Sequence, residues 1–215
     1  MLQKNNFWDS VGLKKKFTIP FNFPIFFEEI DTNSSILDYG CGYGRVTNLI
    51  WDKGYSNVFG CDISFNMLYR AKQNKPKLNF FQIDSNKNTL PCKNSSFEVI
   101  FLIAVLTCII DDKKQFNLVK ELKRVLKPDG YLFVSDFLLN TDDRNIKRYN
   151  SCLSKFNTYG IFETEDKVCL RHHSKDHILN LFKDFSVISL SLDTFTTMNN
   201  HTSNGFYLSL KNKVN

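Results

Sequence analysis

Short apolar runs that alternate with helix-like segments limit the fold of this chain more than any other feature. Five runs of five to seven residues, rich in Ile, Val, Leu and Phe, read as strands: 35–39, 57–62, 78–84, 97–103 and 131–136. Segments with apolar residues at helical spacing occupy three of the four intervals, at 45–53, 64–74 and 112–126. Strands joined by helices form a parallel sheet with right-handed crossovers, so this order predicts an α/β fold.

The rest of the chain extends this pattern into one domain of 215 residues. The KPDG turn at 127–130 is expected to stop the third helix. Residues 137–172 are polar and irregular, and they are too many for a simple connection in a compact domain, so we predict an insertion there. A helix at 175–185 and two strands, at 186–193 and 205–211, are expected after it.

Composition argues against several classes of protein. No apolar core of a signal peptide opens the chain, and the longest apolar run, at 99–110, has 12 residues where a membrane span needs about 20. The six cysteines show no CxxC spacing, which favours a reduced, cytosolic protein. The net charge is +6, but the lysines are scattered and densest only at 14–16, so nucleic acid is disfavoured as a partner.

The first strand runs into a glycine-rich stretch, ILDYGCGYGRVT at 36–47. Gly40, Gly42 and Gly44 occupy every second position, where glycine permits positive φ and removes the Cβ that would keep a ligand off the backbone. Ligands of parallel sheets bind beyond the carboxyl ends of the strands, at this point of the topology. A dinucleotide site has the spacing GxGxxG and aims helix amides at a pyrophosphate. Here the spacing is GxGxG behind a carboxylate, Asp38, which suits an ammonium group instead.

Acidic residues also stand at the ends of the next two predicted strands. Asp62 is placed to accept both hydroxyls of a ribose, and Asp84 to accept the exocyclic amine of adenine, with Ser85 at the same rim. Met67 offers the adenine a soft apolar surface. Each aspartate alone is as often a turn former or a helix cap, and Met67 alone is more often a core residue. Their joint placement predicts S-adenosylmethionine, which combines an ammonium, a sulfonium, a ribose and an adenine without a phosphate.

These stretches resemble the motifs of the class I S-adenosylmethionine-dependent methyltransferases. ILDYGCGYGR is similar to the family's first motif, GCDIS with Met67 to the second, and QIDS to the third. FEVIFLIAVLTCI resembles the fourth motif, with Phe97-Glu98 where the family usually has Phe-Asp, and LKPDGYLFVSDF resembles the region of strand five. The resemblance implies a Rossmann-like, doubly wound sheet of seven strands in the order 3-2-1-4-5-7-6, with strand seven antiparallel. It also implies cofactor contacts from Ile63 and Ile103.

The resemblance covers residues 35–136 by motif and 175–211 by architecture, and it implies that the insertion 137–172 helps to build the acceptor side. His172 and His173, at the end of that insertion, are candidates for a general base or for binding an anionic acceptor. The alternative is that the RHH stretch is a solvated loop before the next helix. No metal site is predicted, because the histidines are too few and unsuitably spaced.

A small molecule with an O, N or S nucleophile is the predicted methyl acceptor, by elimination. Family members that methylate base amines or glutamine carry an Asn/Asp-Pro-Pro-Tyr-like motif after strand four, whereas this chain has Ile-Ala-Val-Leu at 103–106. The basic residues form no stripe with interleaved aromatics. Transfer or ribosomal RNA is the alternative acceptor, and an inactive, cofactor-binding partner subunit is the alternative function.

The N-terminal lead, residues 1–34, mixes aromatic and basic side chains. We predict that it closes over the cofactor as a lid, with Phe7, Trp8 and Phe17 against the acceptor site. The alternative is an arm that packs on the core.

Overall fold

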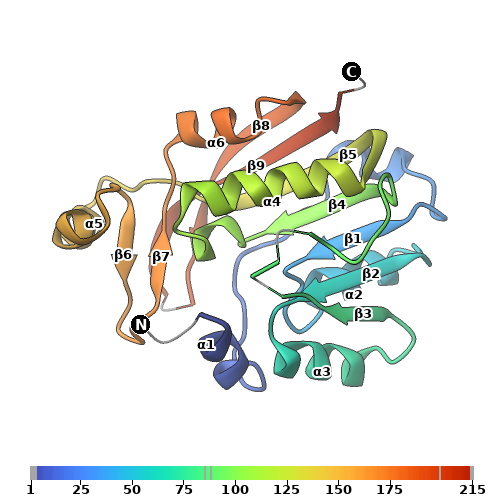
Figure 1. Cartoon of the computed structure of the whole chain (residues 1–215), viewed down its shortest axis with the longest axis horizontal. Helices are drawn as coiled ribbons and strands as arrows, with labels where there is room; N and C mark the ends of the chain where they lie inside the picture. Colours follow the sequence, from blue (N-terminus) through green and yellow to red (C-terminus); the bar gives the residue numbers. More distant parts are fainter. Residues whose placement is uncertain (1–3, 85, 88, 199, 214–215) are drawn as a thin grey trace.

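A seven-stranded sheet forms the centre of the protein, described by a computed structural model over residues 4–84, 86–87, 89–198 and 200–213 (Figure 1). The strands are β1 (Ile36–Tyr39), β2 (Val58–Asp62), β3 (Asn79–Gln82), β4 (Phe97–Ile103), β5 (Leu126–Phe137), β8 (Phe185–Thr196) and β9 (Thr202–Asn212). Their order in the sheet is β3-β2-β1-β4-β5-β9-β8. β1 to β5 are parallel, and β9 is antiparallel to both neighbours. The predicted order is confirmed, since β8 and β9 are the sixth and seventh strands of this sheet.

Helices cover both faces of the sheet and leave its carboxyl edge to the loops. The helices are α1 (Lys4–Val11), α2 (Arg45–Asp52), α3 (Phe65–Asn74), α4 (Asp112–Val125), α5 (Asp143–Phe156) and α6 (Lys175–Leu181), with short 3-10 turns η1 (Ile25–Glu29) and η2 (Leu106–Cys108). α4 and α6 pack on one face and α2 and η1 on the other (Figure 1). Side chains alternate along each strand. Leu132 and Val134 therefore enter the core beneath α4 and α6, and Phe133 enters the core beneath α2 and η1.

The segment predicted as an insertion, 137–172, lies between β5 and α6, but it is not irregular. It contains α5 and a hairpin of two short strands, β6 (Ile161–Glu163) and β7 (Cys169–Arg171). The prediction missed a helical signal, since apolar residues recur at helical spacing in α5: Ile146, Tyr149, Leu153 and Phe156. Figure 1 places α5, β6 and β7 beyond one end of the sheet, on the same side as α1.

The predicted KPDG turn at 127–130 lies within β5. Pairing of β5 with β4 holds at Leu126, shifts across KPDG and resumes at Tyr131, so these residues form a bulge with Asp129 at a φ of 60°. α4 nevertheless ends at Val125, one residue before the predicted end of this helix and just ahead of KPDG.

Two further properties concern the part of the chain that the structure describes. All six cysteines are free thiols there. None of the helices in that part is long and apolar enough to cross a membrane.

Candidate active site

The glycine-rich loop leaves the carboxyl end of β1 and leads into α2. Gly40, Gly42 and Gly44 have φ values of 72°, 54° and 79°, which residues with a Cβ reach only with strain. The loop is tied to β2, because the backbone N–H groups of Gly40 and Cys41 donate to the carbonyl of Cys61, at 2.8 and 2.9 Å. The loop therefore has the left-handed glycine conformation that the sequence predicted.

Asp38 lies behind this loop and is 2% exposed. Its Oδ2 accepts hydrogen bonds from the backbone N–H and the hydroxyl of Thr47, at 2.9 and 2.6 Å. Burial raises the pKa of the Asp38 carboxyl from 3.8 to about 6, against the lowering effect of the Thr47 bonds. The bonds tie β1 to the start of α2 and hold the carboxyl group in one orientation. Nothing in the sequence indicated Thr47 as the partner.

Asp62 joins the glycine loop to the start of α3. Its Oδ2 accepts a hydrogen bond from the N–H of Gly42, and its Oδ1 accepts one from the N–H of Ser64, both at 2.9 Å. Burial raises the pKa of Asp62, while these backbone donors oppose the rise. Ser64 in turn caps α3 by accepting a hydrogen bond from the N–H of Met67 at 3.2 Å. One carboxylate thus fixes both the loop and the adjacent helix.

The predicted apolar contacts differ in how accessible they are. Ile63 follows the end of β2 and Ile103 ends β4, and both side chains are half-buried. Met67 is 1% exposed, which fits the core position that was its alternative assignment. Ala104, directly after β4, has a φ of 56°. A left-handed alanine is strained, and such strain collects at functional sites.

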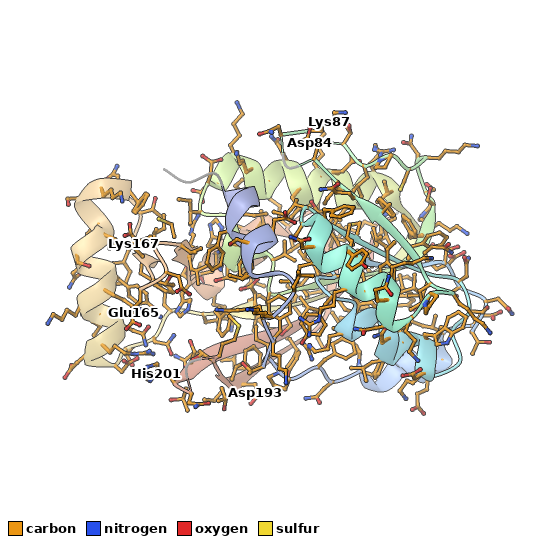
Figure 2. All side chains as sticks on the ribbon, turned by 90° about the horizontal axis from the view of Figure 1, so that it is seen from below. Asp84, Lys87, Glu165, Lys167, Asp193 and His201 are labelled. Atoms are coloured by element: carbon orange, nitrogen blue, oxygen red, sulfur yellow. The ribbon has the colours of Figure 1, made fainter. Side chains whose placement is uncertain are left out.

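The predicted contact from Asp84 lies farther out than the sequence suggested. β3 ends at Gln82, so Asp84 belongs to the following loop and is exposed. Its Oδ1 accepts a hydrogen bond from the N–H of Asn86 at 2.9 Å. Figure 2 shows Asp84 near Lys87 at the periphery of the molecule. Ser85 lies outside the described residues.

α1 docks on the N-terminus of α3, next to Asp62. The carboxylate of Asp9 accepts hydrogen bonds from the hydroxyl of Ser64 and from the N–H of Asn66, both at 2.9 Å. The side chain of Asn66 returns a bond to the carbonyl of Asp9, at 3.0 Å. The sequence did not single out Asp9, since its partners lie more than 50 residues away.

Residues 12–24, here called the N-terminal arm, continue from α1 across the glycine loop. The ring of Phe17 stacks on Tyr43 with centroids 5.3 Å apart, and the N–H of Phe17 donates to the Tyr43 hydroxyl at 3.1 Å. Arg70 holds its guanidinium 3.9 Å from the centre of the same tyrosine ring. A Cβ placed on Gly42 would stand 2.6 Å from the Phe17 ring, so the arm covers the bare backbone directly.

The same arm reaches the last strands of the sheet. The hydroxyl of Thr18 donates to the carbonyl of Thr196 in β8, at 2.9 Å. Ile19 packs in a small buried cluster with Phe137 and Phe195, at the carboxyl ends of β5 and β8. The arm therefore spans the edge of the sheet from the cofactor loop toward the predicted acceptor side.

His172 is buried, with 4% exposure, so the interpretation of RHH as a solvated loop is wrong. Its Nδ1 lies 2.6 Å from the Tyr149 hydroxyl and 3.1 Å from Nδ2 of Asn140. Its ring stacks on Phe137 with centroids 5.3 Å apart. Burial, followed by the positive charge of Arg148, holds the pKa of His172 well below its ordinary value.

His173 is 1% exposed and engages both of its ring nitrogens. Nε2 lies 2.8 Å from Nε2 of Gln115, an obligate donor, so His173 accepts there and its Nδ1 proton faces the carbonyl of Phe137 at 3.4 Å. Burial lowers the pKa of His173 to about 3, so the ring is neutral. His177 donates from Nε2 to Oε1 of the same glutamine, at 2.7 Å. Within the described residues, no three side chains of His, Cys, Asp or Glu are grouped to hold a metal ion.

Asp136 is a buried carboxyl that the sequence did not single out. It is fully buried near the end of β5 and accepts hydrogen bonds from the N–H groups of Phe137 and Thr107, at 2.7 and 3.1 Å. Burial raises the pKa of Asp136 from 3.8 to about 7. Its backbone partners anchor η2, the short turn that follows β4, against β5.

A family model described as a methyltransferase domain matches residues 37–134, which include the parallel strands β1 to β5 almost entirely. Among solved structures, an S-adenosylmethionine-dependent methyltransferase from Methanosarcina mazei is similar with a TM-score of 0.84 and 24% identity, covering 91% of this chain and 100% of that one. Another, from Anabaena variabilis, has a TM-score of 0.67 and 15% identity, covering 97% and 93%. At these identities the structures show a shared fold.

Curated relatives are similar over about half of the chain. A demethylmenaquinone methyltransferase from Paenarthrobacter aurescens is 28% identical over 51% of this chain and 41% of its own length. A tRNA N(3)-cytidine methyltransferase from Bos taurus is 32% identical over 47% of this chain and 29% of its own length. The chain thus spans less than half the length of these relatives. Over residues 37–134 the chain matches a methyltransferase domain, and it shares its fold with solved S-adenosylmethionine-dependent methyltransferases.

Proposed function

We propose that this chain transfers a methyl group from S-adenosylmethionine to a small-molecule acceptor with an O, N or S nucleophile. The observation that carries the proposal is the pair of bonds from Asp62, which hold the left-handed glycine loop and α3 around one carboxylate. When bound, the cofactor supplies a methyl carbon already activated by positive sulfur. The protein then has to orient donor and acceptor, which is worth about 7–11 kcal/mol of the barrier when the geometry is right.

The carboxylates and the loop divide the recognition of the cofactor between them. Asp38 would pair with the ammonium group, through the oxygen that Thr47 does not use. Asp62 would accept the ribose hydroxyls with the lone pairs left by its two backbone donors. Gly42 and its neighbours would leave room for the methionine portion, and Ile63 and Ile103 would wall the adenosine. The adenine contact from Asp84 requires its exposed loop to fold inward.

The N-terminal arm would serve as the lid of this site. Support comes from its position, because Phe17 already contacts the loop backbone at Gly42. In this proposal, opening of the arm breaks the bonds of Phe17 and Thr18 and withdraws Ile19 from its cluster. Closure would exclude water from the reacting groups.

His172 and His173 are assigned a positioning role in this proposal. Both imidazoles hold the end of the insertion against β5, and both are kept neutral by burial. The acceptor nitrogen of His173 is already occupied by Gln115, so no lone pair is available for an acceptor proton. An acceptor that needs no base, such as a carboxylate or a thiolate, fits this arrangement.

The acceptor class rests on what the chain offers at its carboxyl edge. The relatives named above include an enzyme named for a quinone and another named for tRNA. A small molecule is favoured for this chain because its 28 basic residues are dispersed and the arm covers the edge where a polynucleotide would approach. The activity is tested by incubating the protein with methyl-labelled S-adenosylmethionine and separated metabolite and RNA fractions of its cells of origin.

Label in the low-mass fraction would support the proposal, and label confined to RNA would refute the acceptor class. Uptake of cofactor without label in either fraction would identify an inactive, cofactor-binding subunit.

A matched pair of variants tests the site itself. Asp62→Asn should weaken cofactor binding by about 1–3 kcal/mol through lost charge-assisted hydrogen bonds, whereas Asp52→Asn, on the exposed face of α2, should not. Equal affinity of the two variants would remove Asp62 from the site.

A further inference from the structure

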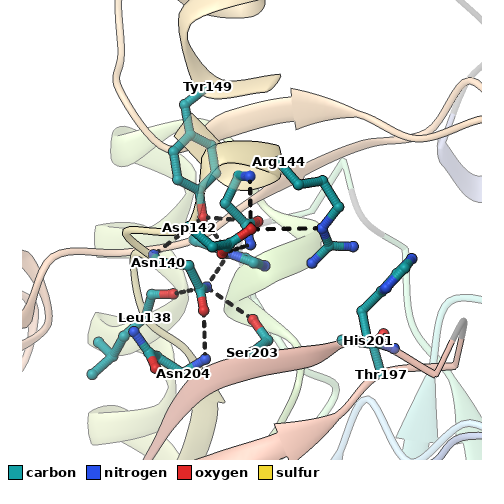
Figure 3. Close-up of polar contacts among 11 residues, drawn as sticks. Leu138, Asn140, Asp142, Arg144, Tyr149, Thr197, His201, Ser203 and Asn204 are labelled. Atoms are coloured by element: carbon teal, nitrogen blue, oxygen red, sulfur yellow. Dashed lines mark hydrogen bonds and ion pairs between the residues drawn. The ribbon is translucent and has the colours of Figure 1, made fainter. Parts of the chain in front are cut away.

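A polar pocket lies at the carboxyl edge of β5, where the insertion begins and the β8–β9 hairpin turns. It encloses about 360 Å³ and is lined by amide, hydroxyl and charged side chains, with no large apolar residue. The arginine and the histidine of its lining, Arg144 and His201, come from α5 and from the residue before β9. Figure 3 shows these two side chains lying on the same side of Ser203.

The floor of this pocket is held rigidly by Asn140. Its Nδ2 donates to the carbonyl of Leu138 and to the hydroxyl of Ser203, both at 2.9 Å. Its Oδ1 accepts a hydrogen bond from the N–H of Asn204 at 2.8 Å. Asn140 and Ser203 are 7% and 1% exposed, so the pocket has a buried polar base that needs no rearrangement to meet a ligand (Figure 3).

The lining of this pocket carries one cation, Arg144, and one carboxylate, Asp142. The carboxylate of Asp142 caps α5, accepting hydrogen bonds from the backbone and side-chain nitrogens of Asn145, so its charge already faces the helix N-terminus. Arg144 makes one contact with that carboxylate, a long ion pair of 3.9 Å, and no other polar partner of its guanidinium occurs among the described residues. Its remaining N–H donors are free for a ligand, beside the His201 ring. The planar fork of donors on a guanidinium is suited to a carboxylate or a phosphate.

We propose that this pocket binds a carboxylate or phosphate group of the methyl acceptor, with Arg144 and His201 as its donors. The proposal rests on the proposed function, because it places the pocket on the acceptor side of the same reaction. β9 is two strands from β4, beside which the methyl donor is expected to lie. Neighbouring strands are about 4.8 Å apart, so the acidic group should stand roughly 10 Å from the methylated atom. The acceptor would therefore be an elongated acid or a phosphorylated metabolite.

Binding of the anionic group can be measured without knowing the acceptor. Inorganic phosphate and malonate are titrated separately into the full chain, and the backbone amide shifts of Arg144 and Ser203 are followed by NMR. We expect saturable shifts at both residues. Arg144→Gln should weaken binding at least tenfold and His201→Gln severalfold. Lys147→Gln, the same change of charge on the exposed side of α5, should stay within twofold. Equal weakening by the Arg144 and Lys147 variants, or no shift at Arg144 and Ser203, would overturn the site.

The same samples distinguish this proposal from the function on which it rests. S-adenosylhomocysteine should bind wild type and Arg144→Gln equally, while labelled low-mass product should fall at least tenfold in the variant. Cofactor binding without phosphate binding would overturn the pocket and leave the methyltransferase proposal standing. Phosphate binding without cofactor binding would overturn the methyltransferase proposal and the acceptor role of the pocket. Arg144-dependent label in RNA would overturn the assignment to a small acid.

Discussion

Replacement of Gly42 by alanine tests how closely the N-terminal arm covers the cofactor loop. Gly42 has a φ of 54°, and a Cβ there would stand 2.6 Å from the Phe17 ring. Gly54 provides a matched control, because it also has a positive φ, 97°, and a Cβ there would meet no atom within 4 Å. Both variants place alanine at a positive φ, and only Gly42→Ala adds the contact with Phe17.

The expected magnitudes follow from these two terms. Alanine in a left-handed conformation costs about 1–2 kcal/mol, and both variants bear that cost. At Gly42 the clash adds about 1–3 kcal/mol, the usual range for overpacking. Phe17 is held by its backbone bond to the Tyr43 hydroxyl and by stacking on that ring, so it yields little. Gly54→Ala should therefore lower the free energy of unfolding by about 1–2 kcal/mol, and Gly42→Ala by about 2–5 kcal/mol.

Urea denaturation of both variants measures this difference, and calorimetric titration with S-adenosylhomocysteine measures its consequence for the site. Gly42→Ala should bind the nucleoside at least tenfold more weakly, because the new Cβ occupies the space beside the loop, whereas Gly54→Ala should bind it as wild type does. Equal losses of stability in the two variants would show that Phe17 does not press on the loop. Unchanged binding by Gly42→Ala would remove the loop from the site.

Three further predictions concern single residues. Ala104→Gly should change the unfolding free energy by less than about 1 kcal/mol, since relief of the left-handed strain offsets the entropy of glycine, while Ala71→Gly, in the buried face of α3, should cost at least about 1 kcal/mol. Burial raises the pKa of Asp136 from 3.8 in the unfolded chain to about 7 in the folded one, so the folded state holds this proton more tightly. The stability that this proton contributes is therefore lost as pH rises from about 4 to 7. In urea titrations, the free energy of unfolding of Asp136→Asn should depend less on pH over that range than that of wild type. Asp9→Asn, which weakens the bonds to α3, should speed amide hydrogen exchange in α1 without speeding it in the core strands.

The central part of the fold could be predicted because the inner strands β1, β2 and β4 are largely buried on both faces and read as continuous apolar runs. The strand at 97–103 matches β4 residue for residue. The insertion was predicted less well, although α5 carries a local signal. Apolar residues stand at helical spacing in it, and the prediction of an irregular segment overlooked them: Ile146, Tyr149, Leu153 and Phe156.

In the candidate site, the sequence indicated the loop and two of the three carboxyl groups, Asp38 and Asp62, since glycine spacing and residues at strand ends are local signals. It did not locate the groups that hold them. Thr47 beneath Asp38, Asp9 on the cap of α3 and Gln115 beside His173 are all brought into contact by tertiary structure. The burial of His172 depends on Tyr149 of α5 and Phe137 of β5, and that of His173 on Gln115 of α4, contacts that only the tertiary structure brings together.

One measurement tests the central claim most directly: calorimetric titration of the pure protein with S-adenosylmethionine, S-adenosylhomocysteine and a nicotinamide dinucleotide, on wild type and on Asp62→Asn. The claim predicts saturable binding of the first two by wild type, weaker binding by the variant, and no heat from the dinucleotide. Binding of the dinucleotide with no uptake of either methionine nucleoside would contradict it.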